Sequence, residues 1–285
     1  MAVTVPKADF IGTLLETLCY GMYFVFFTRF IRVLYARHLA GRPARYLLAI
    51  AIVIFLLITA HLSIQVNRIT RAFTDNMDVA NGPALYYSKL SKKESAAKAS
   101  IYVALTLICD ILMVYRVYVV YDRKRAIIAV PFVLFLADLA LAVWYVWSGS
   151  HVSRSRLGMS PLVPINIFYG VTLALNLLCT IMIALKIWTI HRKLPGRAVA
   201  GVRIQGIVAI IVESAAIYTC VLVTLIVTSI IHTIGLWIVL DPIPPIIGMV
   251  FMNVMVRASR QYHSDTFLSI NLSLPTYLES EDGKA

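Results

Sequence analysis

Ionisable side chains interrupt several long apolar stretches of this sequence. Asp110 and Arg116 lie in a run of Leu, Ile, Val and Met, and Asp138 lies in another such run. At the centre of a membrane-spanning helix a charged side chain costs about 2.5–3.5 kcal/mol, so residues of this kind handle ions or protons, contact ligands, or pair with one another. The candidates for a polar network or a ligand or ion site are Glu16, His61, Asp110, Arg116, Asn176, Glu213 and Asp241.

The elements that must position these residues are transmembrane helices. Of the 285 residues, 60% are hydrophobic and only 14% are charged, whereas about a quarter of the residues of a soluble domain are charged. Lipid offers no partner to backbone N–H and C=O groups, so a long apolar block must be helical. The sequence therefore predicts an all-α polytopic membrane protein, with a single seven-helix transmembrane domain over residues 1–256. The predicted spans are 10–35, 45–66, 97–121, 126–147, 162–190, 204–231 and 234–256.

The basic residues predict the orientation of this bundle. If the N-terminus lies outside, the cytoplasmic side carries more Lys and Arg residues than the outer side, as is usual in membrane proteins. We therefore predict an outside N-terminus and a cytoplasmic C-terminus. The net charge of +12 then indicates loops that face anionic lipid, and not a nucleic-acid-binding surface. Segment 257–285 is polar with an acidic end, so we expect a disordered cytoplasmic tail. The expected partners are the lipid bilayer and a cytosolic signalling protein at the basic inner loops, and the expected location is the plasma membrane.

Depth along the spans indicates which polar residues meet. Glu16 and His61 lie at matching depths on consecutive spans, and we expect them to form a hydrogen bond. Asp110 and Arg116 are six residues apart, which places them about 120° apart around one helix, so each needs a partner on another span. For Arg116 we expect a contact with Glu213 on the sixth span.

The sequence leaves several possible partners for Asp110. It lies near the middle of the bilayer, at a depth close to that of Asn176 and Asp138, and either could be its partner. A bound cation or protonation of the carboxyl group would satisfy it equally well. The alternative to any site is that all these polar residues only link helices, which is worth about 0.6 kcal/mol per link on average.

The seventh predicted span contains the sequence LDPIPPIIG at 240–248. Its three prolines within four positions cannot continue a helix, because proline has no N–H to donate. Asp241 followed by Pro242 is typical of a helix start, with the aspartate as the N-cap. We therefore expect a break or sharp kink one third of the way along this span.

Several classes of function are excluded by residues that the sequence lacks. No lysine lies between 204 and 256, so the last span cannot carry a retinal Schiff base. The histidines are too scattered for a multi-His zinc site, and G-x-S-x-G, P-loop and H-E-x-x-H motifs do not occur. All four cysteines fall inside predicted spans, so no loop disulfide or CxxC site is expected. We expect neither an enzyme nor a cofactor or metal site.

Several of these polar residues lie in short sequence motifs that resemble those of a known family. Glu16 with Tyr20-Gly21, His61, YYSKLS before Lys98, Asp110 with YRVY at 115–118, and VESAAIY at 212–218 together resemble the seven-span integral membrane protein family of basidiomycete fungi. The resemblance covers all seven spans. It implies the fold and topology, and it implies that Glu16, His61, Asp110, Arg116 and Glu213 are the family's polar positions, but the family brings no established activity. Members usually have Trp where Tyr121 stands and Pro near 250–251; both are absent here.

Two functional hypotheses follow, with a third as their alternative. The first is a receptor-like heptahelical sensor, in which a pocket near Glu16, His61 and Asp241 controls the contact between Arg116 and Glu213. The second is a proton- or ion-coupled transporter or lipid translocator that uses Asp110 as its coupling carboxylate. The third is a structural membrane protein without a site.

Overall fold

The computed structural model describes residues 4–39, 45–74, 82–83, 86, 92–151, 162–192, 198–231 and 235–253. Seven helices in this part of the chain are long and apolar enough to cross a membrane, which confirms the predicted all-α fold with seven apolar spans. The predicted tail 257–285 lies outside the described residues, as do segments 40–44, 152–161 and 193–197. The helices are α1 (Val5–Leu39), α2 (Arg45–Phe73), α4 (Lys92–Val120), α5 (Arg125–His151), α6 (Leu162–Arg192), α7 (Ala198–Ile230) and α8 (Gly235–Leu240), which residues 243–253 follow as the second half of the seventh span.

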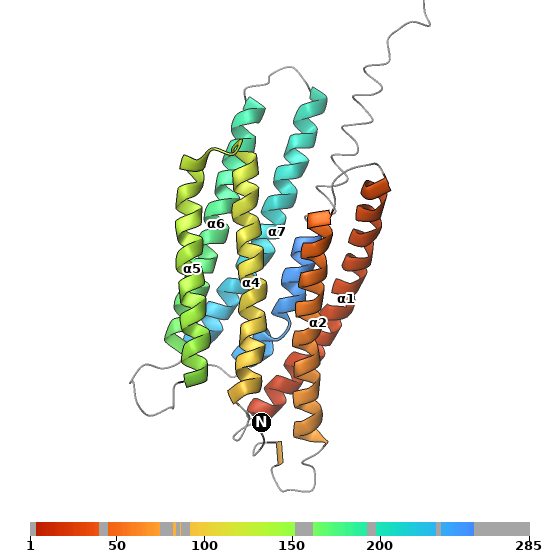
Figure 1. Cartoon of the computed structure of the whole chain (residues 1–285), viewed down its shortest axis with the longest axis vertical. Coiled ribbons are helices and arrows are strands. Elements are labelled where there is room, and N and C mark those ends of the chain that lie inside the picture. The colour runs from red at the N-terminus through yellow and green to blue at the C-terminus, as the bar shows by residue number, and fades with distance from the viewer. Residues whose placement is uncertain are drawn as a thin grey trace, which may run out of the picture.

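The helices lie side by side and run alternately up and down the bundle (Figure 1). We call the end at which α1, α4, α6 and α8 begin the N-terminal end. Each helix packs on the next along the chain, and α8 packs back on α1, so that the seven spans form a closed ring. Because α4 packs on α2, α5 and α6, its polar residues can reach three neighbours.

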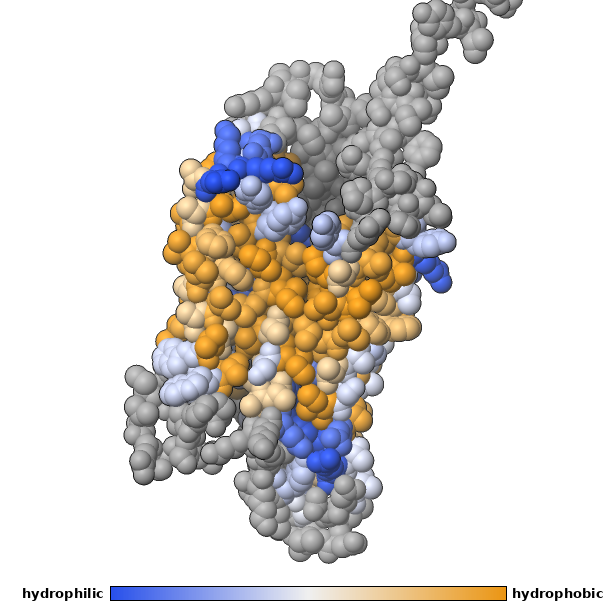
Figure 2. Space-filling model, viewed as in Figure 1, coloured by the Kyte–Doolittle hydropathy of each residue, from blue (hydrophilic) through white to orange (hydrophobic). Residues whose placement is uncertain are grey.

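The sides of the bundle are apolar. On the face that Figure 2 shows, hydrophobic side chains cover the middle of the bundle and hydrophilic ones gather toward its two ends. Large apolar residues such as Leu18, Leu56, Val133 and Leu185 are exposed on this surface. An apolar surface of this extent is typical of a protein whose sides face lipid. The seven apolar helices are those of a multi-pass membrane protein.

The seventh span is broken, as the prolines predict. Helix α8 ends at Leu240, Asp241 and Pro242 form a turn, and the helix resumes at 243. Pro244 and Pro245 have no N–H to donate, and the amide of Ile246 donates to the carbonyl of Pro242 at 3.3 Å.

A glycine lets the second half of this span lie close to its neighbours. A Cβ at Gly248 would lie 2.5 Å from Cδ1 of Ile58 and 2.6 Å from Cε2 of Tyr23. Ile58 and Tyr23 are both fully buried on α2 and α1, so neither has room to move aside. Small residues at such crossings are how membrane helices approach closely. The segment 243–253 is therefore packed directly against α1 and α2.

A tight turn joins α4 to α5 at the end opposite the N-terminal end. Asp122 and Arg123 have positive φ angles of 55° and 61°, which residues other than glycine seldom adopt. The amide of Arg123 donates to the carbonyl of Tyr118, and that of Asp122 to the carbonyl of Val119, the two bonds of a Schellman motif. The turn exposes a basic run, Arg123 to Arg125.

Candidate functional site

Eight polar side chains are buried together at the N-terminal end of the bundle, and we call them the end cluster. They come from α1, α2, α4 and the break in the seventh span, and none is more than 6% exposed. Polar groups so far from water need partners from one another. The end cluster consists of Asp9, Thr13, Glu16, His61, Gln65, Arg68, Lys98 and Asp241.

An ion pair at the break of the seventh span is the centre of the end cluster. The ammonium group of Lys98 donates to Oδ1 of Asp241 at 2.5 Å and to Oε1 of Gln65 at 2.7 Å. The amide of Gln65 donates in turn to Oδ2 of Asp241 at 3.0 Å. Charge-assisted bonds of this kind are the strong ones in a dry interior. They tie the break in the seventh span to α2 and α4.

The predicted role of Asp241 as an N-cap is thereby corrected. Among the described residues, its carboxylate bonds only Lys98 and Gln65, and not the backbone of the helix that follows. The reason is that the long side chain of Lys98 brings a positive charge to it, and an ammonium group binds a carboxylate more strongly than a neutral backbone N–H does.

Two further pairs, each of an acid and a base, belong to the end cluster. Nδ1 of His61 and Oε1 of Glu16 lie 2.6 Å apart, which confirms the predicted hydrogen bond between the first two spans. Arg68 lies 3.9 Å from Oδ2 of Asp9 and donates to Gln65 at 3.4 Å. Each acid of the end cluster therefore lies beside a base.

Gly12 lets α1 reach the break. A Cβ at this position would lie 2.5 Å from Oδ2 of Asp241 and 3.1 Å from the carbonyl oxygen of Trp237. Only glycine leaves room for the aspartate in this arrangement. The close approach of α1 therefore helps to enclose the Lys98–Asp241 pair.

A pocket of about 170 Å³ lies beside the end cluster, and we call it the end pocket. Helices α2, α4, α5 and α8 line it, and three of its side chains, His61, Arg68 and Lys98, are basic. The acids that pair with these bases, Asp9, Glu16 and Asp241, are not part of the pocket lining. Because the bases line the pocket and the acids do not, the pocket is suited to an anionic group.

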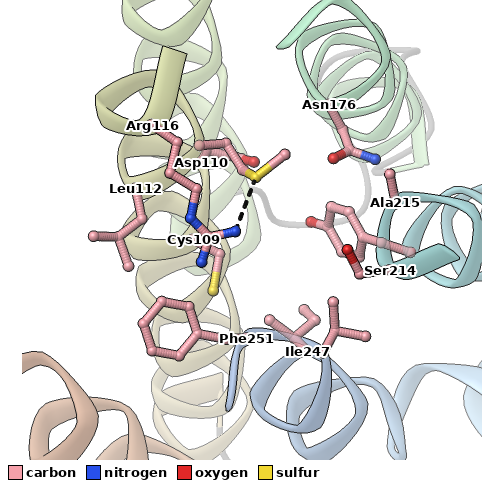
Figure 3. A pocket seen from close by; sticks show the side chains of 12 residues that line it. Cys109, Asp110, Leu112, Arg116, Asn176, Ser214, Ala215, Ile247 and Phe251 are labelled. Carbon is pink, nitrogen blue, oxygen red and sulfur yellow. Dashed lines mark hydrogen bonds between the residues drawn. The ribbon is translucent and has the colours of Figure 1, made fainter. Parts of the chain in front are cut away.

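A second, smaller pocket of about 50 Å³ lies between α4, α6, α7 and the segment 243–253. We call it the central pocket, and Figure 3 shows the side chains that point into it. Its polar lining residues include Asp110, Arg116, Asn176, Ser214 and Tyr218, and its apolar ones include Ile247 and Phe251. It has room for a few water molecules, because one water needs roughly 10–15 Å³ of such space.

Arg116 has weak partners in the central pocket. Its Nη1 lies 3.8 Å from the sulfur of Met113, and its guanidinium lies 5.8 Å from the centre of the Phe251 ring (Figure 3). Its Nη2 is buried and has no hydrogen-bond partner among the described residues. A guanidinium placed in this way contacts sulfur and an aromatic face but no carboxylate in the part of the chain that the structure describes.

The predicted contact between Arg116 and Glu213 is therefore wrong. Glu213 is exposed on α7, whereas the next two residues, Ser214 and Ala215, are buried and line the central pocket. Depth along the spans placed Glu213 within reach of Arg116. The direction in which a side chain leaves its helix depends on how that helix is rotated in the bundle, and depth carries no information about rotation.

Asp110 lies beside Asp138, one of the partners that the sequence left open. The two buried carboxyl groups, on α4 and α5, interact directly and are close enough for a hydrogen bond. Such a bond between two carboxyl groups requires a proton on one of them. The hydroxyl of Thr172 on α6 donates to Oδ1 of Asp138 at 2.9 Å, whereas Oδ2 of each aspartate has no partner among the described residues.

Asn176 serves another contact. Its side-chain amide donates to the hydroxyl of Thr219 at 3.4 Å and so links α6 to α7. It lines the central pocket together with Asp110 without a hydrogen bond between the two among the described residues. Asp110, Arg116 and Asn176 are therefore brought to one pocket, while Glu16, His61 and Asp241 are brought to the other site.

Thr13 and four charged or amide-bearing members of the end cluster were not predicted. The four are Asp9, Gln65, Arg68 and Lys98. They lie at or beyond the ends of the apolar blocks, where polar residues are normally exposed. A helical repeat could have found three of them. Gln65 and Arg68 follow His61 by four and seven residues, and Asp9 precedes Glu16 by seven, so each shares the face of a predicted residue.

The fold and the sites together define a seven-helix bundle with apolar sides, a buried end cluster beside the end pocket, and a central pocket. Among the described residues, no group of three or more His, Cys, Asp or Glu side chains could hold a metal ion. No family model, curated protein or solved structure matches this chain.

Proposed function

We propose that this protein is a receptor-like membrane sensor, in which a small ligand binds in the end pocket and changes the central pocket. The single observation that carries this proposal is the position of Lys98. Its side chain lines the end pocket, and it also bonds Asp241 at the break of the seventh span. A ligand that draws Lys98 toward the pocket weakens the bond that holds the break, and so favours another arrangement of that span.

The segment after the break leads to the central pocket. Ile247 and Phe251 both line that pocket, and the ring of Phe251 lies against the guanidinium of Arg116. A shift or rotation of the segment 243–253 therefore changes the contacts of Arg116. Arg116 lies two turns before the basic turn Arg123–Arg125, which is exposed and suited to an acidic surface on a cytosolic signalling protein.

The native Cys109 gives a direct test, because it lines the central pocket. In a version of the chain that keeps Cys109 and has the other three cysteines replaced by alanine, we would measure its rate of alkylation by a small thiol reagent. Alkylation depends on access to the thiol. We expect Asp241→Asn to change the rate several-fold, because it weakens the bond to Lys98.

The control for this test is Glu16→Gln. It alters the same cluster at a pair that does not hold the seventh span, so we expect the rate to stay near that of the parent chain. If Asp241→Asn also leaves the rate of Cys109 alkylation unchanged in a folded protein, the proposed link between the two pockets is absent and the sensor function is refuted.

A second function, proton- or ion-coupled transport, is favoured by the pair of buried carboxyl groups at Asp110 and Asp138. Two adjacent carboxyl groups that share a proton can take up and release it as their surroundings change. Asp110→Asn would then abolish pH-driven uptake into proteoliposomes, while Glu213→Gln, at an exposed position, would leave it intact. If neither flux nor Cys109 reactivity depends on these residues, both polar sites serve only to hold helices together.

We further propose the topology and the location. An outside N-terminus places the basic turn Arg123–Arg125 in the cytoplasm, in agreement with the preference of Lys and Arg for that side. The resemblance to the basidiomycete seven-span family supports the same arrangement, and the plasma membrane is the proposed location. A membrane-impermeant reagent should label a cysteine that replaces Lys124 only after the membrane has been opened.

A further inference from the structure

We propose that the end pocket binds a small organic monocarboxylate with a compact apolar body, of about the size of benzoate. This inference rests on the proposed function, since it names the class of ligand for the same pocket. Three features of the pocket support it: the charges that border it, the nature and size of its remaining space, and the ion pair that it touches.

The charges that border the pocket favour an anion. Arg68 and Lys98 reach it from α2 and α4, and both are buried, at 3% and 6% exposed. The carboxylates of the end cluster are not part of its lining. An ammonium ligand would meet these two bases first and be repelled, whereas a carboxylate would meet donors on two sides.

The remaining walls favour an apolar body on that anion. Tyr102, Tyr145 and Trp237 contribute aromatic surface from α4, α5 and α8. A cavity of about 150 Å³ takes up a benzene molecule in a protein interior, and the end pocket measures about 170 Å³. A single ring with one carboxylate therefore matches both the size and the division of the pocket into a basic and an aromatic part.

The ion pair beside the pocket explains why a carboxylate would act as a signal. The ligand and Asp241 offer Lys98 the same chemical group, so Lys98 can exchange one for the other without losing its ion pair. Asp241 keeps its bond from the amide of Gln65 at 3.0 Å. A neutral ligand of the same shape could fill the pocket but could not take the place of Asp241 on Lys98.

Small residues on α4 make the room, and they provide a variant that leaves every charge in place. Ala99 lines the pocket, whereas Ala97 is exposed two residues away on the same helix. Ala99→Leu should fill part of the pocket, and Ala97→Leu adds the same side chain outside it. Both substitutions favour the helix about equally, because alanine and leucine are both good helix formers.

The test is binding to the full chain in lipid nanodiscs, measured by calorimetry and by the shift in melting temperature. The probes are benzoate, its neutral counterpart benzamide and its cationic counterpart benzylamine. We expect saturable binding of benzoate with a rise in melting temperature, at least tenfold weaker binding of the other two, and at least a tenfold loss of benzoate affinity in Ala99→Leu. Ala97→Leu should bind benzoate as the parent chain does.

The proposal is overturned if benzoate does not bind, if benzamide or benzylamine binds as well as benzoate, or if Ala99→Leu keeps the parent affinity. Alkylation of Cys109, measured in the same samples, separates this inference from the proposed function. If benzoate binds without changing that rate, the ligand class stands and the sensor function fails. If benzylamine binds in the end pocket and changes the rate, the sensor function stands and the ligand class is wrong.

Discussion

The end cluster and the central pocket are both buried, polar and built from several helices, but they treat charge in opposite ways. In the end cluster every base has an acid beside it, as in the pairs Lys98–Asp241 and His61–Glu16. In the central region two acids, Asp110 and Asp138, lie together. The base that lines the same pocket, Arg116, pairs with no carboxylate among the described residues.

Because of this difference, we expect the end cluster to hold the bundle in one arrangement, whereas the central pocket can adopt more than one. Paired charges in a dry interior resist any movement that separates them, because an unpaired buried charge is unstable. A buried charge without an opposite charge beside it, such as the guanidinium of Arg116, gains from a rearrangement that brings it a partner or a water molecule. The seventh span contacts both sites, so the end cluster can control the central pocket through it.

The largest effect should come from breaking the central pair of the end cluster. Lys98→Met leaves the carboxylate of Asp241 buried without its ammonium partner, and removal of one member of a buried pair costs about 3–5 kcal/mol. We expect the free energy of unfolding to fall by about that amount, as measured by denaturation in mixed micelles. The double variant Lys98→Met/Asp241→Asn should recover a large part of the loss, since it removes both charges.

Lys124→Met is the matched control for that measurement, because Lys124 is exposed and should tolerate the same change within about 0.5 kcal/mol. A loss below about 1 kcal/mol in Lys98→Met, equal to that of an exposed pair, would mean that the end cluster does not hold the bundle together.

A smaller loss is expected at the second pair of the end cluster. Glu16→Ala removes the partner of Nδ1 of His61, which is buried, and a buried polar group left unsatisfied costs about 1–3 kcal/mol. Glu16→Gln keeps a carbonyl acceptor at the same place and should lose less. If Glu16→Gln and Glu16→Ala are equally destabilised in the same denaturation experiment, the hydrogen bond is not what stabilises this pair.

The sequence was sufficient to predict the helices and the break, since both depend on local properties. Apolar length alone identifies the spans, and the prolines that remove N–H groups identify the break near Asp241. The Glu16–His61 bond could also be predicted, because consecutive antiparallel spans are neighbours and equal depth then brings two residues together. The partners of Arg116 and Lys98 depend on the rotation and packing of helices far apart in the chain, as the exposed position of Glu213 shows.

Within the central region, one link should behave as an ordinary helix contact. Thr172→Val removes the hydroxyl that donates to Oδ1 of Asp138 at 2.9 Å and keeps the shape of the side chain. Hydrogen bonds between membrane helices contribute about 0.6 kcal/mol on average and up to about 1.7 kcal/mol. We expect a loss of the free energy of unfolding in that range, with Thr189→Val, at an exposed position, as the control.

A loss as large as that of Lys98→Met would contradict this expectation for Thr172→Val. It would show that the Asp110–Asp138 pair holds the bundle as firmly as the end cluster does, and the distinction between the two sites would disappear.

The smallest effect on stability is expected at Arg116. Arg116→Met removes a contact with the ring of Phe251, worth about 0.5–2 kcal/mol. It also removes a buried nitrogen without a hydrogen-bond partner among the described residues, and such a nitrogen costs about 1–3 kcal/mol. The two changes offset each other, so we expect the free energy of unfolding to change by less than about 1 kcal/mol in either direction.

The functional effect of the same variant should be large, because Arg116 is the group whose contacts the seventh span controls. In Arg116→Met, the change of Cys109 alkylation that Asp241→Asn produces should shrink toward zero, although the protein remains folded. A variant that is stable but whose Cys109 alkylation no longer responds to Asp241→Asn would show that Arg116 transmits the change at the end cluster without stabilising the bundle. If Arg116→Met is instead destabilised as much as Lys98→Met, Arg116 has a strong partner in the folded protein, and the central pocket is as fixed as the end cluster.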